Sequence, residues 1–284
     1  MFNSISEQAS KLVNLTNRTP FVRSHSRSKL LTITSGKGGV GKSTFTANIA
    51  YLLSLRGYKI AIIDADIGLA NMQVLLNVRP QYTIFDYIDA KASLEDIILK
   101  TPYENVFLLA GQSGYAYSNH SNSFVLSRIV EDTLNLNLFD FVLVDTGAGL
   151  NDYVQEFLKI SDNILALTTT DPSALTDVYA LMKMLSKDKD SLMLCFNHTK
   201  THKIGDTISK SLENLALKNR LNSNFMLKYI GNVSTSSTIS TTSRLRKLFA
   251  CEFGEDVVTR ELKEVTNTLL KNIHQGKNES SFNW

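Results

Sequence analysis

A glycine-rich segment with two lysines follows the first apolar run of the chain and reads Gly36-Lys37-Gly38-Gly39-Val40-Gly41-Lys42-Ser43-Thr44. Closely spaced glycines let successive backbone N–H groups point at one phosphate, and a helix that begins at the end of the loop adds the positive end of its dipole. In this pattern we expect Lys42 to reach the β- and γ-phosphates, the Ser43 hydroxyl to bind Mg²⁺ and Thr44 to reach the α-phosphate. A glycine-rich turn that binds no ligand is disfavoured, because the glycines, the lysine and the serine all stand at the spacing that a phosphate-binding loop requires.

Acidic side chains follow two later apolar runs, at points where parallel strands present ligands. Asp64 and Asp66 follow residues 59–63, and Asp145 follows residues 141–144. A single aspartate after a strand is more often a helix cap. Two strands downstream of a phosphate loop end this way, and phosphoryl transfer depends mainly on positioning and charge neutralisation. These carboxylates are therefore candidate groups of a nucleotide site.

The elements that must position these side chains are visible as alternating patterns. Short apolar runs that are continuous rather than alternating predict strands buried on both faces, over residues 30–34, 59–63, 105–109, 141–144, 163–168, 192–196 and 226–230. Residues 43–56 and 150–159 carry apolar side chains at helical spacing instead. Such alternation predicts an α/β fold of three layers, with a mostly parallel sheet flanked by helices on both faces.

The chain divides into a short arm and one domain. It has 284 residues, of which 43% are apolar and 20% charged, and this excludes extensive disorder, collagen and coiled coil. We expect an N-terminal arm over 1–29, with a short helix over 4–15 and a linker, then the α/β domain over 30–275 and a polar tail over 276–284.

The cysteines and apolar runs indicate the compartment. Cys195 and Cys251 do not make a disulfide framework, which fits a reducing environment. No run reaches the roughly 18 apolar residues of a membrane span. The polar N-terminus lacks the apolar core of a secretory signal, so we expect a cytoplasmic protein.

The positive net charge of +3 does not mark a nucleic-acid-binding domain. Residues 1–30 carry one acid, Glu7, and the basic side chains Lys11, Arg18, Arg23, Arg27 and Lys29. The remainder of the chain is close to neutral, which disfavours a strong contact with phosphate backbones. A basic arm of this kind can steer toward an acidic partner surface.

The first lysine of the loop, Lys37, indicates which class of phosphate-binding protein this sequence resembles. The order KGGVGKST over residues 37–44 resembles the deviant Walker A motif of the ParA/MinD family of ATPases. That resemblance covers most of the chain after residue 30 and implies a P-loop ATPase that uses ATP and Mg²⁺. It implies that Lys37 reaches across a nucleotide-sandwich dimer to the phosphates of the second subunit, with Lys42 and Asp66 as the other catalytic residues.

The same resemblance gives roles to the strand ends. Asp66 resembles the family residue that positions the attacking water, Asp64 its neighbour near the Mg²⁺ shell, and Asp145 the Walker B acid that holds Mg²⁺ through water. Gly147 and Gly149 resemble the switch loop that senses the γ-phosphate. Asn197 resembles the asparagine that binds the adenine edge; a simple loop asparagine is the alternative.

Three further segments, 64–71, 145–149 and 169–179, resemble the FlhG (YlxH) group of this family, which regulates flagellar number. FlhG proteins begin with a motif that binds the GTPase FlhF and stimulates its GTP hydrolysis. Residues 7–13 are similar, with Gln8 as the functional glutamine and Val13 in place of an arginine. The resemblance implies an ATP-dependent homodimer with an FlhF-type GTPase and flagellar assembly proteins as partners. A frayed, solvated terminus is the alternative for the arm.

Membrane and DNA are the remaining candidate partners. FlhG and MinD proteins usually end in a basic amphipathic helix that binds the inner face of the cell membrane, and the cell pole is a second expected location. Here the helical stripe runs through Val258, Leu262, Val265 and Leu269. Glu261 and Glu264 interrupt its polar face, so we expect this helix to pack on the domain. The alternative function is a ParA-type partition ATPase that binds DNA non-specifically.

Overall fold

The computed structural model describes residues 27–66, 70–112, 124–200 and 202–275. Its strands are β1 (Lys29–Ser35), β2 (Ile60–Ala65), β3 (Ile98–Lys100), β4 (Val106–Leu109), β5 (Phe141–Ala148), β6 (Asn163–Thr168), β7 (Ser191–Thr199) and β8 (Met226–Ser234). Its helices are α2 (Lys42–Ser54), α3 (Met72–Leu75), α4 (Ile84–Ile88), α5 (Phe124–Asn135), α6 (Asp152–Ile160), α7 (Pro172–Leu185), α8 (His202–Lys218), α9 (Ser237–Arg244), α10 (Phe249–Glu252) and α11 (Val257–Gln275). Gln8, the helix predicted over 4–15 and the tail 276–284 lie outside the described residues.

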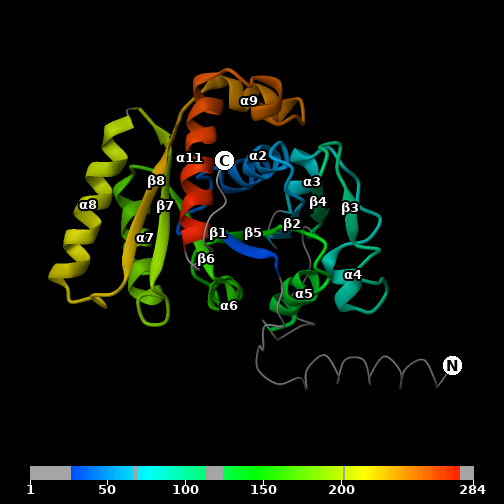
Figure 1. Cartoon of the computed structure of the whole chain (residues 1–284), viewed down its shortest axis with the longest axis horizontal. Coiled ribbons are helices and arrows are strands. Elements are labelled where there is room, and N and C mark those ends of the chain that lie inside the picture. Colours follow the sequence, from blue (N-terminus) through cyan, green and yellow to red (C-terminus); the bar gives the residue numbers. More distant parts are fainter. Residues whose placement is uncertain (1–26, 67–69, 113–123, 201, 276–284) are drawn as a thin grey trace.

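The strands form one sheet of eight in the order β3-β4-β2-β5-β1-β6-β7-β8 (Figure 1). Neighbouring strands pair in parallel except β3, which runs antiparallel to β4. All residues of β2 are buried, which explains its continuous apolar run. The predicted mostly parallel sheet is confirmed, and the carboxyl ends of β2, β5 and β1 lie next to one another.

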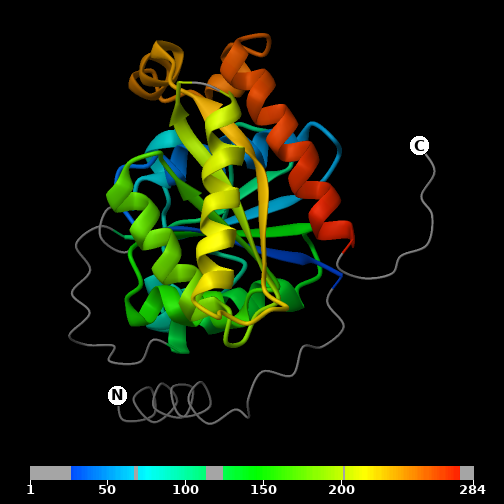
Figure 2. The same ribbon diagram turned by 90° about the vertical axis from the view of Figure 1, so that its left-hand side faces the viewer.

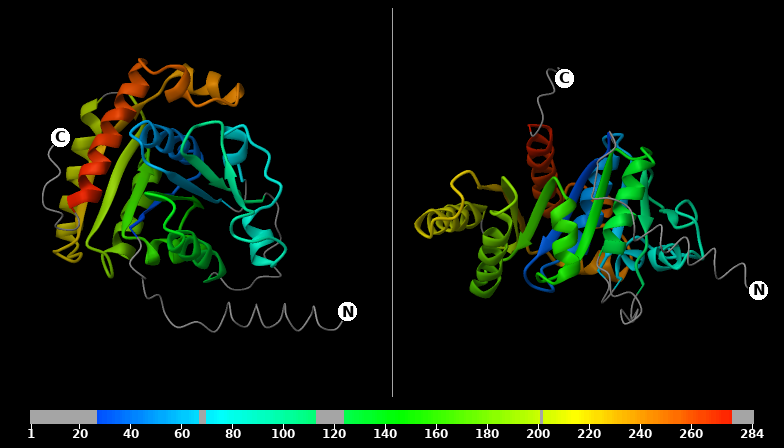
Figure 3. Two further views of the ribbon diagram at one scale, coloured as in Figure 1. Left: turned by 45° about the vertical axis from the view of Figure 1, so that its right-hand side comes forward. Right: turned by 90° about the horizontal axis from the view of Figure 1, so that it is seen from below.

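Helices cover both faces of this sheet (Figures 1 and 2). One face packs against α2 and α11, together with the short helices α3 and α10. The other face packs against α4, α5, α6, α7 and α8. Figure 3 shows the ends of this arrangement from below, with α8 at one end of the sheet and α4 toward the other. The three predicted layers are therefore present.

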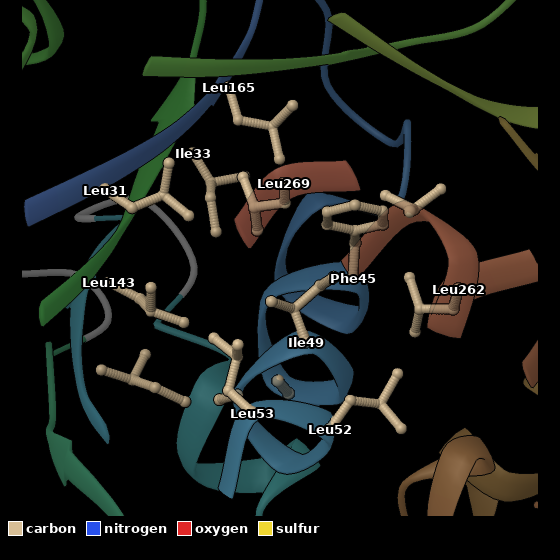
Figure 4. Packing of buried hydrophobic residues seen from close by; sticks show 14 of the residues in the cluster. Leu31, Ile33, Phe45, Ile49, Leu52, Leu53, Leu143, Leu165, Leu262 and Leu269 are labelled. Carbon is tan, nitrogen blue, oxygen red and sulfur yellow. The ribbon is translucent and has the colours of Figure 1, made fainter. Parts of the chain in front are cut away.

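Helix α2 is held by the core that Figure 4 shows. Its inward side chains Phe45, Ile49 and Leu53 are buried against strand residues such as Leu31 and against α11. Full burial of each large apolar side chain is worth about 1.5–3 kcal/mol. Because α2 follows the glycine-rich segment directly, this packing also fixes where that segment ends.

One difference from expectation lies at an edge of the sheet. The strand β3 was not predicted, because three partly exposed residues of an antiparallel edge carry no pattern of their own. The stripe of α11 is buried as expected, at Val258, Leu262, Val265 and Leu269. Within the described ranges, no helix is both long and apolar enough to cross a membrane.

Candidate functional site

The glycine-rich segment connects the end of β1 to the start of α2. Gly39 and Gly41 have φ of +77° and +87°, a conformation in which other residues are strained. Gly36 must also be small, since a Cβ there would lie 2.1 Å from the Cβ of Asp177 on α7. Gly41 precedes the first turn of α2, and no side chain in the described ranges caps that helix. The unsatisfied N–H groups of its first turn can therefore bind an anion.

A fully buried carboxylate lies beside this helix start. Asp145 of β5 is 0% exposed, and its Oδ1 accepts a hydrogen bond from Thr46 Oγ1 at 3.2 Å. Burial raises the pKa of Asp145 to about 6, although the Lys42 ammonium and the hydroxyls of Ser43 and Thr46 act in the opposite direction. Asp145 is thus held next to the two residues expected to bind phosphate and metal.

The other carboxylate oxygen of Asp145, Oδ2, is a candidate ligand for the expected Mg²⁺. Asp145 Oδ2 is buried and accepts no hydrogen bond within the described chain. A buried polar atom of this kind is uncommon in folded proteins and calls for an ion or water. Together with the Ser43 hydroxyl it offers the hard oxygen ligands that Mg²⁺ prefers. The residues present therefore fit a Mg²⁺ bound directly or through water.

The two aspartates after β2 have different environments. Asp64 is 1% exposed, and its carboxylate accepts backbone hydrogen bonds from Asp66 N at 3.3 Å and Met72 N at 3.2 Å. Burial, and then the charge of Asp145, raises its pKa to about 7. Asp66 is half-buried, and a Cβ on Gly147 would lie 3.6 Å from its Oδ1. Asp64 therefore binds the backbone of Asp66 and of Met72, while Asp66 lies near Gly147 at the end of β5.

The raised pKa values of Asp145 and Asp64 predict a stability that falls as pH rises. Unfolded aspartates titrate near pH 4, so the stability that these groups contribute is complete below about pH 4 and is lost as pH rises through 6 to 7. In nucleotide-free protein with a chelator, we expect Asp145→Asn to unfold like wild type at pH 4.5. At pH 8 its free energy of unfolding should exceed that of wild type by about 2 kcal/mol, because the variant has no buried carboxyl group with a raised pKa to ionise. Urea unfolding at both pH values measures this.

The matched control for that experiment is Asp206→Asn. Asp206 is a half-exposed carboxylate on α8 that pairs with Lys210 at 2.7 Å. Its substitution should leave the pH dependence of unfolding parallel to wild type. A parallel curve for Asp145→Asn as well would contradict the assignment of the pH dependence to the buried carboxylate.

Lys37 points toward the start of α7. Its Nζ donates to Asp171 Oδ2 at 2.9 Å and to Ser173 Oγ at 2.8 Å, and the side chains of the ion pair are 46% and 47% exposed. The Lys37 ammonium lowers the pKa of Asp171. Asp171 also caps α7 through Ser173 N, with Pro172 in the first turn. Its second role as the partner of Lys37 was not predicted.

The strand end of β7 contacts the loop directly. Asn197 is 6% exposed, and its Nδ2 donates to the Val40 carbonyl at 2.8 Å. Its Oδ1 accepts the His198 N–H at 3.0 Å. A Cβ on Gly41 would lie 2.6 Å from Asn197 Nδ2. The fold therefore brings Asn197 to the loop.

Gly147 and Gly149, at and just beyond the end of β5, lie at the same edge. Gly147 belongs to β5, and Gly149 has a φ of +85° and donates its N–H to the Ser35 carbonyl at 2.9 Å. Most predicted site residues thus meet around the loop; Gln8 lies outside the described residues. Thr46 and Asp177 were missed, since a helix-interior threonine and a helix aspartate carry no sequence signal of their own.

Known proteins are similar to this chain in sequence. Residues 28–198 match a family model described as AAA domain. The flagellum site-determining protein YlxH of Helicobacter pylori is 35% identical over 275 residues, which cover 96% of this chain and 92% of that protein. The antiactivator FleN of Pseudomonas aeruginosa is 34% identical over 162 residues, which cover 56% of this chain and 57% of that protein.

Solved structures share the fold. The cell division ATPase MinD of Pyrococcus furiosus superposes with a TM-score of 0.75 at 22% identity, over 86% of this chain and 99% of that one. MinD of Pyrococcus horikoshii, solved with Mg-ADP, gives 0.74 at 21% identity, over 89% and 100% of the two chains. On these similarities and the KGGVGKST loop, the chain belongs to the ParA/MinD family of deviant Walker A P-loop ATPases and resembles YlxH within it.

Proposed function

We propose that this chain is a Mg²⁺-dependent ATPase that dimerises on ATP and regulates the number or placement of flagella. The observation that carries the proposal is the uncapped start of α2, which faces the buried Asp145, whose Oδ2 has no hydrogen-bond partner among the described residues. The similarity to YlxH along almost the whole chain supports the flagellar role.

In this proposal the residues divide the work of phosphoryl transfer. The loop N–H groups and Lys42 bind the phosphates, and Ser43 and Asp145 hold Mg²⁺, which neutralises charge on the β- and γ-phosphates. Asp66 orients the attacking water, and Asp64 supports it by holding the loop after β2. Asn197 contacts the base, and the segment with Gly147 and Gly149 responds to the γ-phosphate.

Lys37 is the residue proposed to change partners when the chain dimerises on ATP. In the described structure it is bound to Asp171 and Ser173 of its own chain. We propose that ATP in a second subunit competes for this ammonium, so that dimerisation moves Lys37 from α7 to the partner's phosphates. Size-exclusion chromatography tests this: the wild-type chain should elute as a dimer with Mg·ATP and as a monomer with Mg·ADP. A single elution volume in both nucleotides would contradict it.

The arm is proposed to act on a second protein. Gln8 and its neighbours would stimulate GTP hydrolysis by an FlhF-type GTPase, and other flagellar assembly proteins would be further partners. Peripheral association with the membrane or the cell pole is proposed to depend on such partners, because the polar face of α11 carries Glu264 and its apolar stripe is already buried.

Removal of residues 1–17 is expected to separate the two activities. The truncated chain should keep its ATP hydrolysis within about twofold, since the described residues begin at 27, beyond the deleted segment, and should lose stimulation of an FlhF-type GTPase. Phosphate release from ATP and from GTP measures both effects. Gln8→Ala in the full chain is the finer variant, and Gln73→Ala on α3 is its control. Unchanged stimulation by the truncated chain would rule out the arm as the activator.

A further inference from the structure

The ends of β7 and β8 depart from a regular ladder. Leu194 pairs with Tyr229, whereas the next residue of β7 pairs with Gly231, and a second shift follows Phe196. Such irregularities disrupt the backbone ladder and twist the strands locally. Other contacts must therefore fix these ends, which carry Asn197 beside the phosphate loop.

Side chains supply part of that connection. Asn232 of β8 is 6% exposed, and its Nδ2 donates to Thr199 Oγ1 of β7 at 3.0 Å. Its Oδ1 accepts the Tyr229 hydroxyl at 2.9 Å. Beyond the strand, Thr235 N donates to the Thr199 carbonyl at 3.4 Å. The two strand ends are thus joined at Thr199, two residues after Asn197, through the buried side chain of Asn232 and the backbone of the exposed Thr235.

A carboxylate of α11 binds the same strand end. Glu261 is 4% exposed and accepts two hydrogen bonds from Ser234, from the backbone N at 2.6 Å and from Oγ at 2.7 Å. Ser234 in turn pairs in register with Thr199. Hydrogen bonds to a charged acceptor are short and strong, and two from one residue fix its orientation.

The same helix approaches β8 closely one turn further on. Gly231 has a φ of +131°, and a Cβ there would lie 2.8 Å from Cγ2 of Val265. Glu261 and Val265 are four residues apart and therefore share one face of α11. The helix thus binds the end of β8 at two points, through Ser234 and through Gly231.

We propose that Glu261 is a positioning residue of the nucleotide site: through Ser234 it fixes the paired ends of β7 and β8, and with them the surface that receives the base and ribose. This inference rests on the proposed function, which places the base beside Asn197. Glu261 does not touch the nucleotide. Its effect passes from α11 through Ser234 and Thr199 to the strand end that contacts the loop at Val40.

The test compares ATP with inorganic tripolyphosphate, which has the phosphates but neither base nor ribose. Glu261→Gln keeps the side-chain shape but removes the negative charge, so that both hydrogen bonds from Ser234 lose their charged acceptor. The remaining oxygen can accept from only one of the two Ser234 donors, and the Ser234 hydroxyl must turn to accept from the new NH₂ group. We expect the Kd for Mg·ATP, measured by isothermal titration calorimetry, to rise about tenfold. The Kd for Mg·tripolyphosphate should change less than about twofold. Ser234→Ala should shift the ATP value in the same direction and replaces Glu261→Gln if that variant does not fold.

Glu156→Gln is the matched control. Glu156 lies on α6, is 8% exposed, and accepts from Lys159 Nζ at 2.6 Å, away from both strand ends. Its substitution should leave both Kd values unchanged, even where it lowers stability. An unchanged Kd for ATP in Glu261→Gln and Ser234→Ala, or an equal weakening of ATP and tripolyphosphate, would overturn the positioning role. A wild-type chain that does not bind Mg·ATP would overturn the proposed function itself.

Discussion

Asp66→Ala is expected to lower ATP turnover by about 100-fold or more while the variant remains an ATP-bound dimer. Asp66 stands at the end of β2, half-buried and close to Gly147, and it is the carboxylate proposed to orient the attacking water. Its removal leaves the loop, Lys42 and Asp145 in place, so that ATP and Mg²⁺ still bind. Phosphate release under single-turnover conditions measures the rate, and size-exclusion chromatography with Mg·ATP measures the trapped dimer.

Asp64→Ala is the informative comparison for that variant. Asp64 is buried and holds the backbone of Asp66 and Met72, so its loss should lower stability as well as turnover. Asp206→Ala on α8 should change neither. If Asp66→Ala kept the wild-type turnover, or if its dimer dissociated as fast as wild type, another residue would have to orient the attacking water.

Lys37→Ala is expected to abolish the ATP-dependent dimer at concentrations where wild type is fully dimeric. Each subunit of a two-fold dimer would give one lysine to the other, so the substitution removes two charge-assisted contacts to phosphate. We expect the dimer Kd to rise about 100-fold. Analytical ultracentrifugation with Mg·ATP measures it, and Lys91→Ala, which breaks the exposed pair with Asp89, is the control.

Asp171→Ala should act in the opposite direction. The contact between Lys37 and Asp171 is half-exposed and contributes little to stability. In the proposed dimer it would nevertheless compete with the phosphates of the second subunit for the same ammonium. Its loss should tighten the ATP-dependent dimer by about threefold. Because Asp171 also caps α7 through Ser173 N, the variant should unfold at a lower temperature as well. A weaker dimer in Asp171→Ala would show that Asp171 supports the dimer rather than competing with it.

Much of the fold was predictable because its signals are local. Continuous apolar runs identify strands buried on both faces, and β1, β2, β5 and β6 lie where such runs were found. The antiparallel β3 was missed, since a partly exposed edge strand of three residues forms by pairing with β4 and carries no continuous apolar run. The sheet order was not predictable either, because spacing along the chain does not say which strands become neighbours.

The candidate site divides in the same way. The sequence by itself determined the phosphate loop, since glycines, Lys42 and Ser43 act through their spacing at one strand–helix junction. Only the tertiary structure decided that one buried oxygen of Asp145 has no hydrogen-bond partner in the described part of the chain, that Lys37 is bound by Asp171, and that Glu261 holds the end of β8. These contacts join residues far apart in the chain, and they exist only because particular strands and helices pack side by side.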